Sequence, residues 1–441
     1  MEQRRKNLTQ LFIPICLETL LYMLSGMVDT LMLSSVNDQA VGAVGTANTY
    51  IGIFIIMFSV ISSGMVAVMT QNIGAGRPGV AYQARQLGLT FNAVLGIIVS
   101  LILTFGAGVI LAGVGVADAL MQPARTYLQI VGGFCILNAL IPICSSYLRA
   151  FGFSKEPLYA SIIGNVINFC LNAFFLFVLH KGVAGVATAT VISRIINLVI
   201  VVLLGAVLVK AKQHPERESN RAVMGQIIRI GLPSACETAI YNVSMTLVIR
   251  FLNQMDAQGL NVTARSYTMQ ITNFSYCVGA ALAQANAIMT GWRIGAKEYD
   301  ACDRGTRKAA IIGVIVAVIL ETMFALCSGW IMQLFSKDPQ MVSLVGKLLA
   351  IDIVLEMGRV TNLVYGQALK TSGDAVFPVV MGACFMILCS VGGTYLFGIR
   401  LGLLAVGAYI GMAGDECVRA IGMYLRWKSG KWKEKGLVKS R

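Results

Sequence analysis

Twelve apolar segments, each long enough to cross a lipid bilayer, constrain this chain more than any other feature of its sequence. A helix needs about 20 apolar residues to cross the hydrocarbon core of a membrane. The segments lack the alternating pattern of barrel strands, so their backbone hydrogen bonds must be satisfied within helices. The sequence therefore predicts an all-α polytopic membrane protein with twelve transmembrane helices. The segments cover about residues 11–34, 46–72, 87–114, 124–148, 158–179, 183–209, 227–253, 264–290, 309–335, 341–369, 376–397 and 402–425.

The low charge content and the position of the basic residues agree with this fold class. Only 13% of the 441 residues are charged, against about 25% in soluble domains. The net charge of +14 would suit a nucleic-acid partner, but the basic residues lie in short loops and at the chain ends. Among the basic residues in the loops and at the ends of the spans, 25 fall on one side and 6 on the other, and basic loops face the cytoplasm. We therefore expect a multi-pass protein of the cell inner (plasma) membrane, with both termini cytoplasmic and no nucleic-acid partner.

Features of an enzyme or a metalloprotein are missing from the sequence. Most of the eleven cysteines lie in apolar segments, where they are typical packing residues. The two histidines, His180 and His214, are too few for a His-ligated metal site. No nucleophile–base set and no phosphate-binding loop is present. We expect no enzymatic activity, no cofactor, and a monomer in the lipid bilayer. Residues 1–6 resemble the start of a signal peptide, but no cleavage site follows, which favours a retained first helix.

The chain contains an internal repeat of six spans. The motif PICLETLLYMLS in the first span returns as PSACETAIYNVS in the seventh, 219 residues later. Two pseudo-symmetric six-helix bundles with the same topology, and a central cavity between them, are typical of a transporter that rocks two halves about a site. We therefore expect an N-terminal six-helix lobe over residues 1–209, a cytoplasmic linker over 210–226, and a C-terminal six-helix lobe with a basic tail over 227–441.

A polar stripe follows one face of the first span. Glu18, Tyr22, Ser25 and Asp29 have helical spacing and fall within about 60° of one another. Charges inside a membrane are costly and need a functional reason. Val248 occupies the position of the second repeat that is equivalent to Asp29, so this carboxylate is not part of the symmetric framework. Desolvation should either keep Asp29 protonated or make it bind a cation, which predicts a coupling-ion site.

Further polar residues lie in other spans. Asn168 and Asn172 share a face of the fifth span, where amides suit either cation binding or interhelical packing. In the second half, two sets predict buried acid–arginine pairs that either clamp helices or join a binding site. These sets are Asp352, Glu356 and Arg359 in span ten and Asp415, Glu416 and Arg419 in span twelve.

These motifs together resemble the multidrug and toxic compound extrusion (MATE) family over nearly the whole chain. The resemblance rests on Val28-Asp29-Thr30, the 71–76 loop QNIGAG, the 148–152 motif LRAFG, the Asn168 and Asn172 pair, and the closing Asp415-Glu416-x-x-Arg419 with Arg426-Trp427.

What the resemblance implies is a secondary active antiporter that works by alternating access. Such a protein exports organic, often cationic and amphipathic compounds in exchange for H⁺ or Na⁺. The family's ion site in the first lobe maps onto Asp29, Asn168, Asn172 and Thr190. A second-lobe Na⁺ site of some members falls on Tyr241 and Arg359, so that site is not expected here. The stripe and its repeat give the candidate substrate-cavity residues Glu18, Tyr22, Glu237 and Tyr241, and the span-ten set adds Glu356 and Arg359.

A hinge and two alternatives complete the expectations. Pro14 removes a backbone donor from the first span, which predicts a bend coupled to Asp29. Within the same superfamily, a flippase of a lipid-linked precursor is the alternative, although the membrane acids favour cationic cargo. A channel or a membrane-embedded enzyme is the alternative from a different class.

Overall fold

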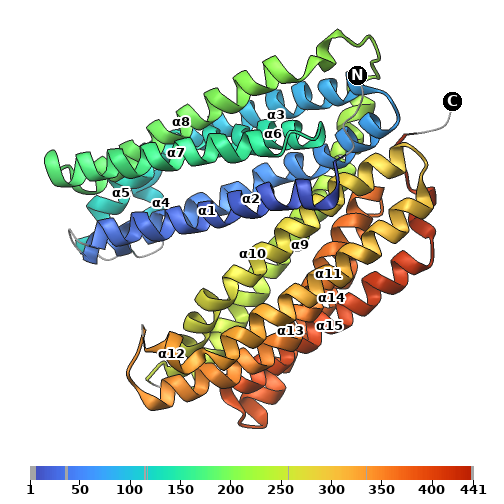
Figure 1. Ribbon diagram of the computed structural model, residues 1–441. Coiled ribbons are helices and arrows are strands. Elements are labelled where there is room, and N and C mark those ends of the chain that lie inside the picture. Colours follow the sequence, from blue (N-terminus) through green and yellow to red (C-terminus); the bar gives the residue numbers. More distant parts are fainter. Residues whose placement is uncertain are drawn as a thin grey trace. The chain divides into compact units, whose positions relative to one another are not determined.

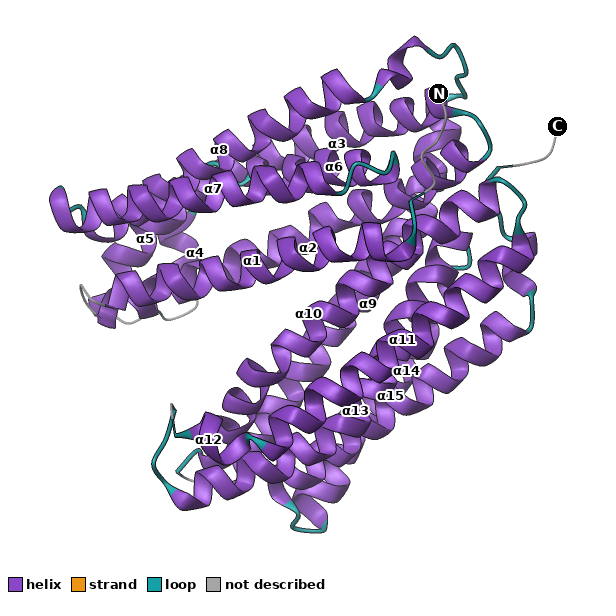
Figure 2. Ribbon diagram, viewed as in Figure 1, coloured by secondary structure: helices purple, strands orange, loops and turns teal. Residues whose placement is uncertain are grey.

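The computed structural model describes residues 6–34, 38–113, 116, 118–256, 258–333 and 335–438. These residues form helices joined by short turns, and no strand occurs among them (Figure 2). Of the basic residues predicted at the two chain ends, Arg4, Arg5, Lys439 and Arg441 lie outside the described residues.

The predicted twelve-span, all-α fold is confirmed, because every predicted span corresponds to a helix or to a broken helix. The first six spans are α1 (Leu8–Ser34), α2 (Asp38–Gly74), α3 with α4 (Pro78–Phe105, Ala107–Gly113), α5 with α6 (Asp118–Gly133, Ile136–Ala150), α7 with η1 (Lys155–Ala173, Phe174–Val178) and α8 (Gly182–Leu208). The second six are α9 (Asn220–Met255), α10 (Leu260–Gly295), α11 with α12 (Tyr299–Leu326, Ser328–Met332), α13 (Pro339–Ser372), α14 with η3 and η4 (Val376–Phe385, Met386–Val391, Thr394–Arg400) and α15 (Leu404–Lys428).

The spans differ in how apolar they are. Seven helices pass a test of length and hydropathy for membrane spans, and α5 with α6, bent by 43°, make an eighth. The long helices α9, α10, α13 and α15 carry more polar residues. Polar side chains inside spans need partners, and these four helices all lie in the second half of the chain.

The chain divides into two compact units, Met1–Gly231 and Leu232–Arg441. In the first unit, α7 lies alongside both α1 and α8, while α2 packs against α3, α5 and α6 (Figure 1). Its apolar core is centred on Phe58, Leu103 and Leu128, all of which are buried. The start of α9 also belongs to this unit. A Cβ on Gly231 would lie 1.7 Å from the Val60 carbonyl oxygen, so the α9 and α2 backbones touch at this glycine.

The linker between α8 and α9 contains η2 (Lys210–Gln213) and is fastened to the start of α3. The Arg217 guanidinium donates to the Gly79 carbonyl at 2.9 Å. The Gln83 amide donates to the Glu218 carbonyl at 2.6 Å and accepts from the Glu218 N–H at 3.0 Å. Arg77 also forms an ion pair with Glu218 at 2.6 Å. The linker is therefore an ordered part of the first unit.

In the second unit, α13 packs against α10, α11 and α15. Its apolar core includes Leu348, Leu349 and Tyr409. The approach of α13 to α15 requires Gly358, since a Cβ there would lie 2.8 Å from the Cys417 nitrogen. This close contact brings the polar residues that flank Gly358 to those of α15.

The C-terminal tail docks on the second unit through a short helix, η5 (Lys431–Glu434). The Trp432 side chain is buried and stacks on Trp427, with ring centroids 4.2 Å apart and planes 8° from parallel. The Trp427 indole donates to Asp303 at 2.8 Å, and the Trp432 indole donates to the Trp427 carbonyl at 3.0 Å. Two aromatic side chains thus hold the tail against the start of α11.

Candidate functional site

The predicted ion site in the first unit brings together Asp29 on α1 with Asn168 and Asn172 on α7. The Asn172 amide nitrogen donates to Asp29 Oδ1 at 2.7 Å and to Asn168 Oδ1 at 3.2 Å. Both asparagines are buried, and the Asn172 Oδ1 atom has no hydrogen-bond partner among the described residues. Because both neighbours of this nitrogen are acceptors, the network fixes the orientation of the Asn172 amide.

The fourth predicted ligand, Thr190 on α8, does not donate to Asp29. Its hydroxyl donates instead to the Val186 carbonyl of its own helix at 2.9 Å. Arg194, one turn further along α8, lies within electrostatic reach of Asp29 and of the buried Tyr127. The site therefore combines one carboxylate, two amides and a nearby guanidinium.

The repeat-related position in the second unit is not a polar site. Val248 is fully buried in the apolar core of that unit, in contact with other hydrophobic side chains. The asymmetry that the sequence predicts between Asp29 and Val248 thus extends to their surroundings.

Pro14 lies inside α1, which continues through it. Proline has no N–H, so the Gln10 carbonyl one turn earlier lacks its usual helical donor. The Ser154 hydroxyl supplies a replacement and donates to the Gln10 carbonyl at 3.1 Å. The predicted hinge is therefore tied to the turn that follows α6.

The candidate substrate-cavity acids Glu18 and Glu237 both form ion pairs within their own unit. Glu18 lies 2.6 Å from Arg149, and Glu237 lies 2.6 Å from Lys370. The two pairs occupy matching positions of the repeat, and each joins a proline-containing helix to the end of the fourth span of its bundle. Tyr22, one turn beyond Glu18, is 71% exposed.

The second unit contains a cluster of charged residues at the contact of α13 with α15. Arg359 forms an ion pair with Glu356 and lies 3.5 Å from Glu416. Arg419 binds Asp415 through two hydrogen bonds of 2.9 Å and lies 2.9 Å from Glu416. The predicted acid–arginine pairs therefore form with Glu356, Asp415 and Glu416. The prediction is wrong for Asp352, which forms no ion pair among the described residues and whose Oδ2 atom has no hydrogen-bond partner there. The Arg359 guanidinium also lies near Tyr241, the other candidate of this region.

Two charged residues of the polar clusters escape the sequence analysis. Arg194 interrupts the apolar run of span six, and Glu321 interrupts that of span nine. Each is a single charge within a long apolar helix, which is the only signal in the sequence that could have pointed to it. Glu321 is fully buried on α11, within electrostatic reach of Asp352 and Glu356 on α13.

The repeated bundles and their buried polar sites define a polytopic membrane transporter of the α-helical class. A family model described as MatE matches the chain twice, over residues 14–174 and 233–396, and each match begins at the proline that opens a repeat. The chain therefore belongs to the MATE family, and the resemblance that the sequence motifs indicate is confirmed.

Individual relatives agree with this assignment. The chain is 34% identical over 431 residues to the uncharacterized transporter YisQ of Bacillus subtilis (strain 168), covering 96% of this chain and 94% of the relative. It is 23% identical over 446 residues to a protein of Thermotoga maritima named probable multidrug resistance protein NorM, covering 98% and 94%. A crystal structure of MATE in the straight conformation superposes with a TM-score of 0.87 at 19% identity, covering 97% of this chain and 96% of that chain, which supports the fold.

Proposed function

We propose that this protein is a secondary active antiporter that exports organic, cationic and amphipathic compounds in exchange for protons. It works as a monomer by alternating access in the cell inner membrane, with both termini in the cytoplasm. The relatives named as multidrug resistance proteins and the basic loops support this proposal.

The hydrogen bond from Asn172 to Asp29 is the observation from which we infer the coupling ion. An amide nitrogen at 2.7 Å stabilises an ionised carboxylate and offers nothing to a metal cation. Na⁺ needs several oxygen ligands arranged around it, whereas a proton needs only one oxygen of the Asp29 carboxylate. The proton therefore suits this single-carboxylate site better than Na⁺.

Protonation of Asp29 would change how α1 packs against α7. The ionised carboxylate accepts the Asn172 amide, whereas the neutral acid carries its own O–H donor and competes for the same acceptors. A ligand shifts a conformational equilibrium only through its different affinity for the two states. The affinity of Asp29 for a proton therefore differs between two conformations if the α1–α7 contact differs between them.

The test is ethidium export by purified protein in proteoliposomes, with a pH gradient or a Na⁺ gradient imposed in turn. We expect the pH gradient to drive export in the wild type and to fail in Asp29→Asn. Asp118→Asn, the same change at an exposed position of the same unit, should transport as the wild type does. Export driven by the Na⁺ gradient alone, or undiminished export by folded Asp29→Asn, would contradict the proposal.

A further inference from the structure

Glu321 is a buried carboxyl group that the proposed coupling site does not use. It lies within α11, and its side chain is 0% exposed. Neither of its carboxylate oxygens forms a hydrogen bond of good geometry among the described residues, although the Ser275 hydroxyl lies close to the carboxyl group. A buried carboxylate without a partner is strongly unfavourable, whereas the neutral acid loses far less on leaving water.

Asp352 on α13 is a second buried carboxyl group, close enough to Glu321 for their charges to interact. Asp352 is 2% exposed, and its Oδ2 atom has no hydrogen-bond partner among the described residues. The ion pairs recorded in the described part of the second unit include neither Asp352 nor Glu321. Two neighbouring like charges disfavour each other's ionised form, so at least one of them should hold a proton.

Arg359 and Arg419 are already paired with other carboxylates. Arg359 pairs with Glu356 and Glu416, and Arg419 pairs with Asp415 and Glu416. The charged or titratable groups that lie near the two carboxyls are Glu356 and Arg359 on α13 and Glu416 and Tyr409 on α15. These groups in turn lie near Tyr276 and Arg265 on α10 and Tyr241 on α9. The Arg265 guanidinium contacts the Met245 sulfur at 3.7 Å, and no described carboxylate forms an ion pair with it.

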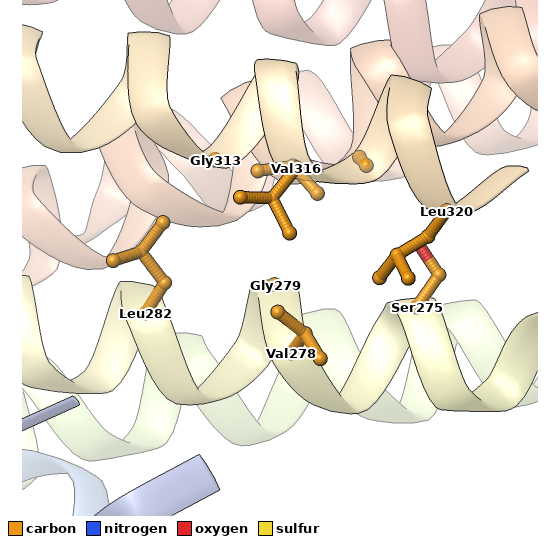
Figure 3. Close-up of a pocket in the computed structure, with 9 residues that line it drawn as sticks. Ser275, Val278, Gly279, Leu282, Gly313, Val316 and Leu320 are labelled. Carbon is orange, nitrogen blue, oxygen red and sulfur yellow. The ribbon is translucent and has the colours of Figure 1, made fainter. Parts of the chain in front are cut away.

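A small cavity lies between α10, α11 and α13, and Leu320, the residue before Glu321, is part of its lining. Its volume of about 10 Å³ is close to what one water molecule requires. Ser275 is the one polar residue of its lining, and its hydroxyl has no hydrogen-bond partner among the described residues. Figure 3 shows Ser275 of α10 facing Leu320 of α11 at one end of the cavity. Glu321 directly follows Leu320, and Ser275 lies within its reach.

The helices around the cavity are held at a fixed spacing. Val360 of α13 fills the room that the missing side chains of Gly279 and Gly313 provide. A Cβ on either glycine would lie 2.8 Å or less from Val360 side-chain atoms. The polar end of the cavity is therefore built into a packed contact of three helices and does not depend on a loop.

We propose that Glu321, with Asp352 beside it, forms a proton-binding site inside the second unit, with Ser275 and one cavity water as its hydrogen-bond partners. The site goes beyond the proposed coupling function, because it shares no residue with the Asp29 site of the first unit. A proton fits better than a metal cation, because the cavity lining offers only one oxygen-bearing side chain. In addition, the described residues contain no group of three His, Cys, Asp or Glu that could hold a metal ion.

The test is infrared difference spectroscopy of the full-length protein in lipid vesicles, which detects protonated carboxyl groups by their C=O stretch. At neutral pH, we expect a carboxylic-acid band in the wild type that Glu321→Gln removes. Glu434→Gln, at an exposed position of η5, is the matched control and should leave the spectrum unchanged. Asp29→Asn should keep the Glu321 band, so failure of the coupling proposal and failure of this one can be told apart.

A second variant keeps the proposal testable if Glu321→Gln does not fold. Ser275→Ala removes the hydroxyl that faces the carboxyl, and the C=O band should shift in frequency while its intensity stays the same. An unchanged band in folded Glu321→Gln, or an unshifted band in Ser275→Ala, would overturn the proposal. Loss of the wild-type band on adding Na⁺ at constant pH would overturn it too, because Na⁺ would then replace the proton.

Discussion

At the scale of single residues, Asn172 is the link between the two helices of the candidate ion site. Its one amide nitrogen serves Asp29 on α1 and Asn168 on α7. The nitrogen therefore holds the Asp29 carboxylate against α7 through its Oδ1 atom. An amide in this place gives the site one negative charge where a carboxylate would have given two.

We expect Asn172→Ala to impair proton-coupled export more than it impairs folding. A hydrogen bond to a charged group contributes about 1.5–3 kcal/mol, so export driven by a pH gradient should fall at least about tenfold. Ethidium export from proteoliposomes measures the effect. Asn165→Ala is the control, because Asn165 lies on the same helix and makes only a long bond of 3.5 Å to the Leu21 carbonyl. Equal losses in both variants would show that Asn172 has no special part in coupling.

At the scale of elements, Pro14 of α1 and Ser154, which precedes α7, depend on each other. The serine hydroxyl replaces the backbone donor that the proline lacks, and it joins α1 to the turn between α6 and α7. The start of α1 is thus held from outside the helix. A bend at Pro14 therefore acts directly on the hydrogen bond between Ser154 and Gln10.

We expect Ser154→Ala to destabilise the protein by about 1 kcal/mol, because the Gln10 carbonyl loses its donor. In a Pro14→Ala background, the new Ala N–H restores the helical bond, and Ser154→Ala should then have less effect. Thermal unfolding of the four proteins of this cycle measures the coupling. Strictly additive effects of the two substitutions would contradict the proposed link.

The docked tail predicts an effect on the second unit. Trp432→Ala removes a buried ring from its stack, and a large-to-small change of this kind costs about 3–5 kcal/mol in a core. We expect faster proteolysis of the tail and a lower unfolding temperature. Trp330→Ala should change stability by no more than about 0.5 kcal/mol, since Trp330 is 72% exposed. A tail equally resistant to protease in Trp432→Ala would refute the anchoring role.

At the scale of the whole molecule, the repeat places equivalent ion pairs in the two units. Glu18 with Arg149 and Glu237 with Lys370 are each 2.6 Å apart, and all four side chains are only 12–16% exposed. Partial burial makes such pairs stronger than surface pairs. The same cross-link therefore stabilises the same part of each bundle.

A double-mutant cycle on each pair should give a favourable coupling energy of about 1–3 kcal/mol. The substitutions are Glu18→Gln with Arg149→Gln, and Glu237→Gln with Lys370→Gln, measured by reversible unfolding in detergent. The exposed pair of Asp303 with Arg307, 3.4 Å apart, is the control and should give at most about 0.5 kcal/mol. A coupling energy near that of the control in either unit would argue against a shared structural role.

Hydropathy and the internal repeat predicted the fold, because membrane spans depend on local composition. They could not give the helix ends, since α9 begins at Asn220 and α10 continues to Gly295, beyond the apolar residues. Polar helix ends form hydrogen bonds with water as readily as loops do. The helix breaks in spans three, four and nine could not be predicted either, because the hydropathy pattern shows only how apolar a segment is.

The candidate site could be predicted where its residues share a helix face. Asn168 and Asn172 are one turn apart, and Asp29 stands out as an acid within an apolar span. The partners of Glu18 and Glu237 could not be predicted, because Arg149 and Lys370 come from distant helices. Glu321 was missed for a related reason, since its role depends on Asp352 and Ser275, which two other helices bring to it.

The stacked indoles of the tail give the molecule an optical signal of its own. The chain has four tryptophans, and two of them lie with ring centroids 4.2 Å apart and nearly parallel planes. Indole rings this close couple their electronic transitions, so they contribute a paired circular-dichroism band that isolated tryptophans do not show. Undocking of the tail separates the rings and removes that band. Attachment of the tail can therefore be followed in the unlabelled protein while it binds a substrate or unfolds.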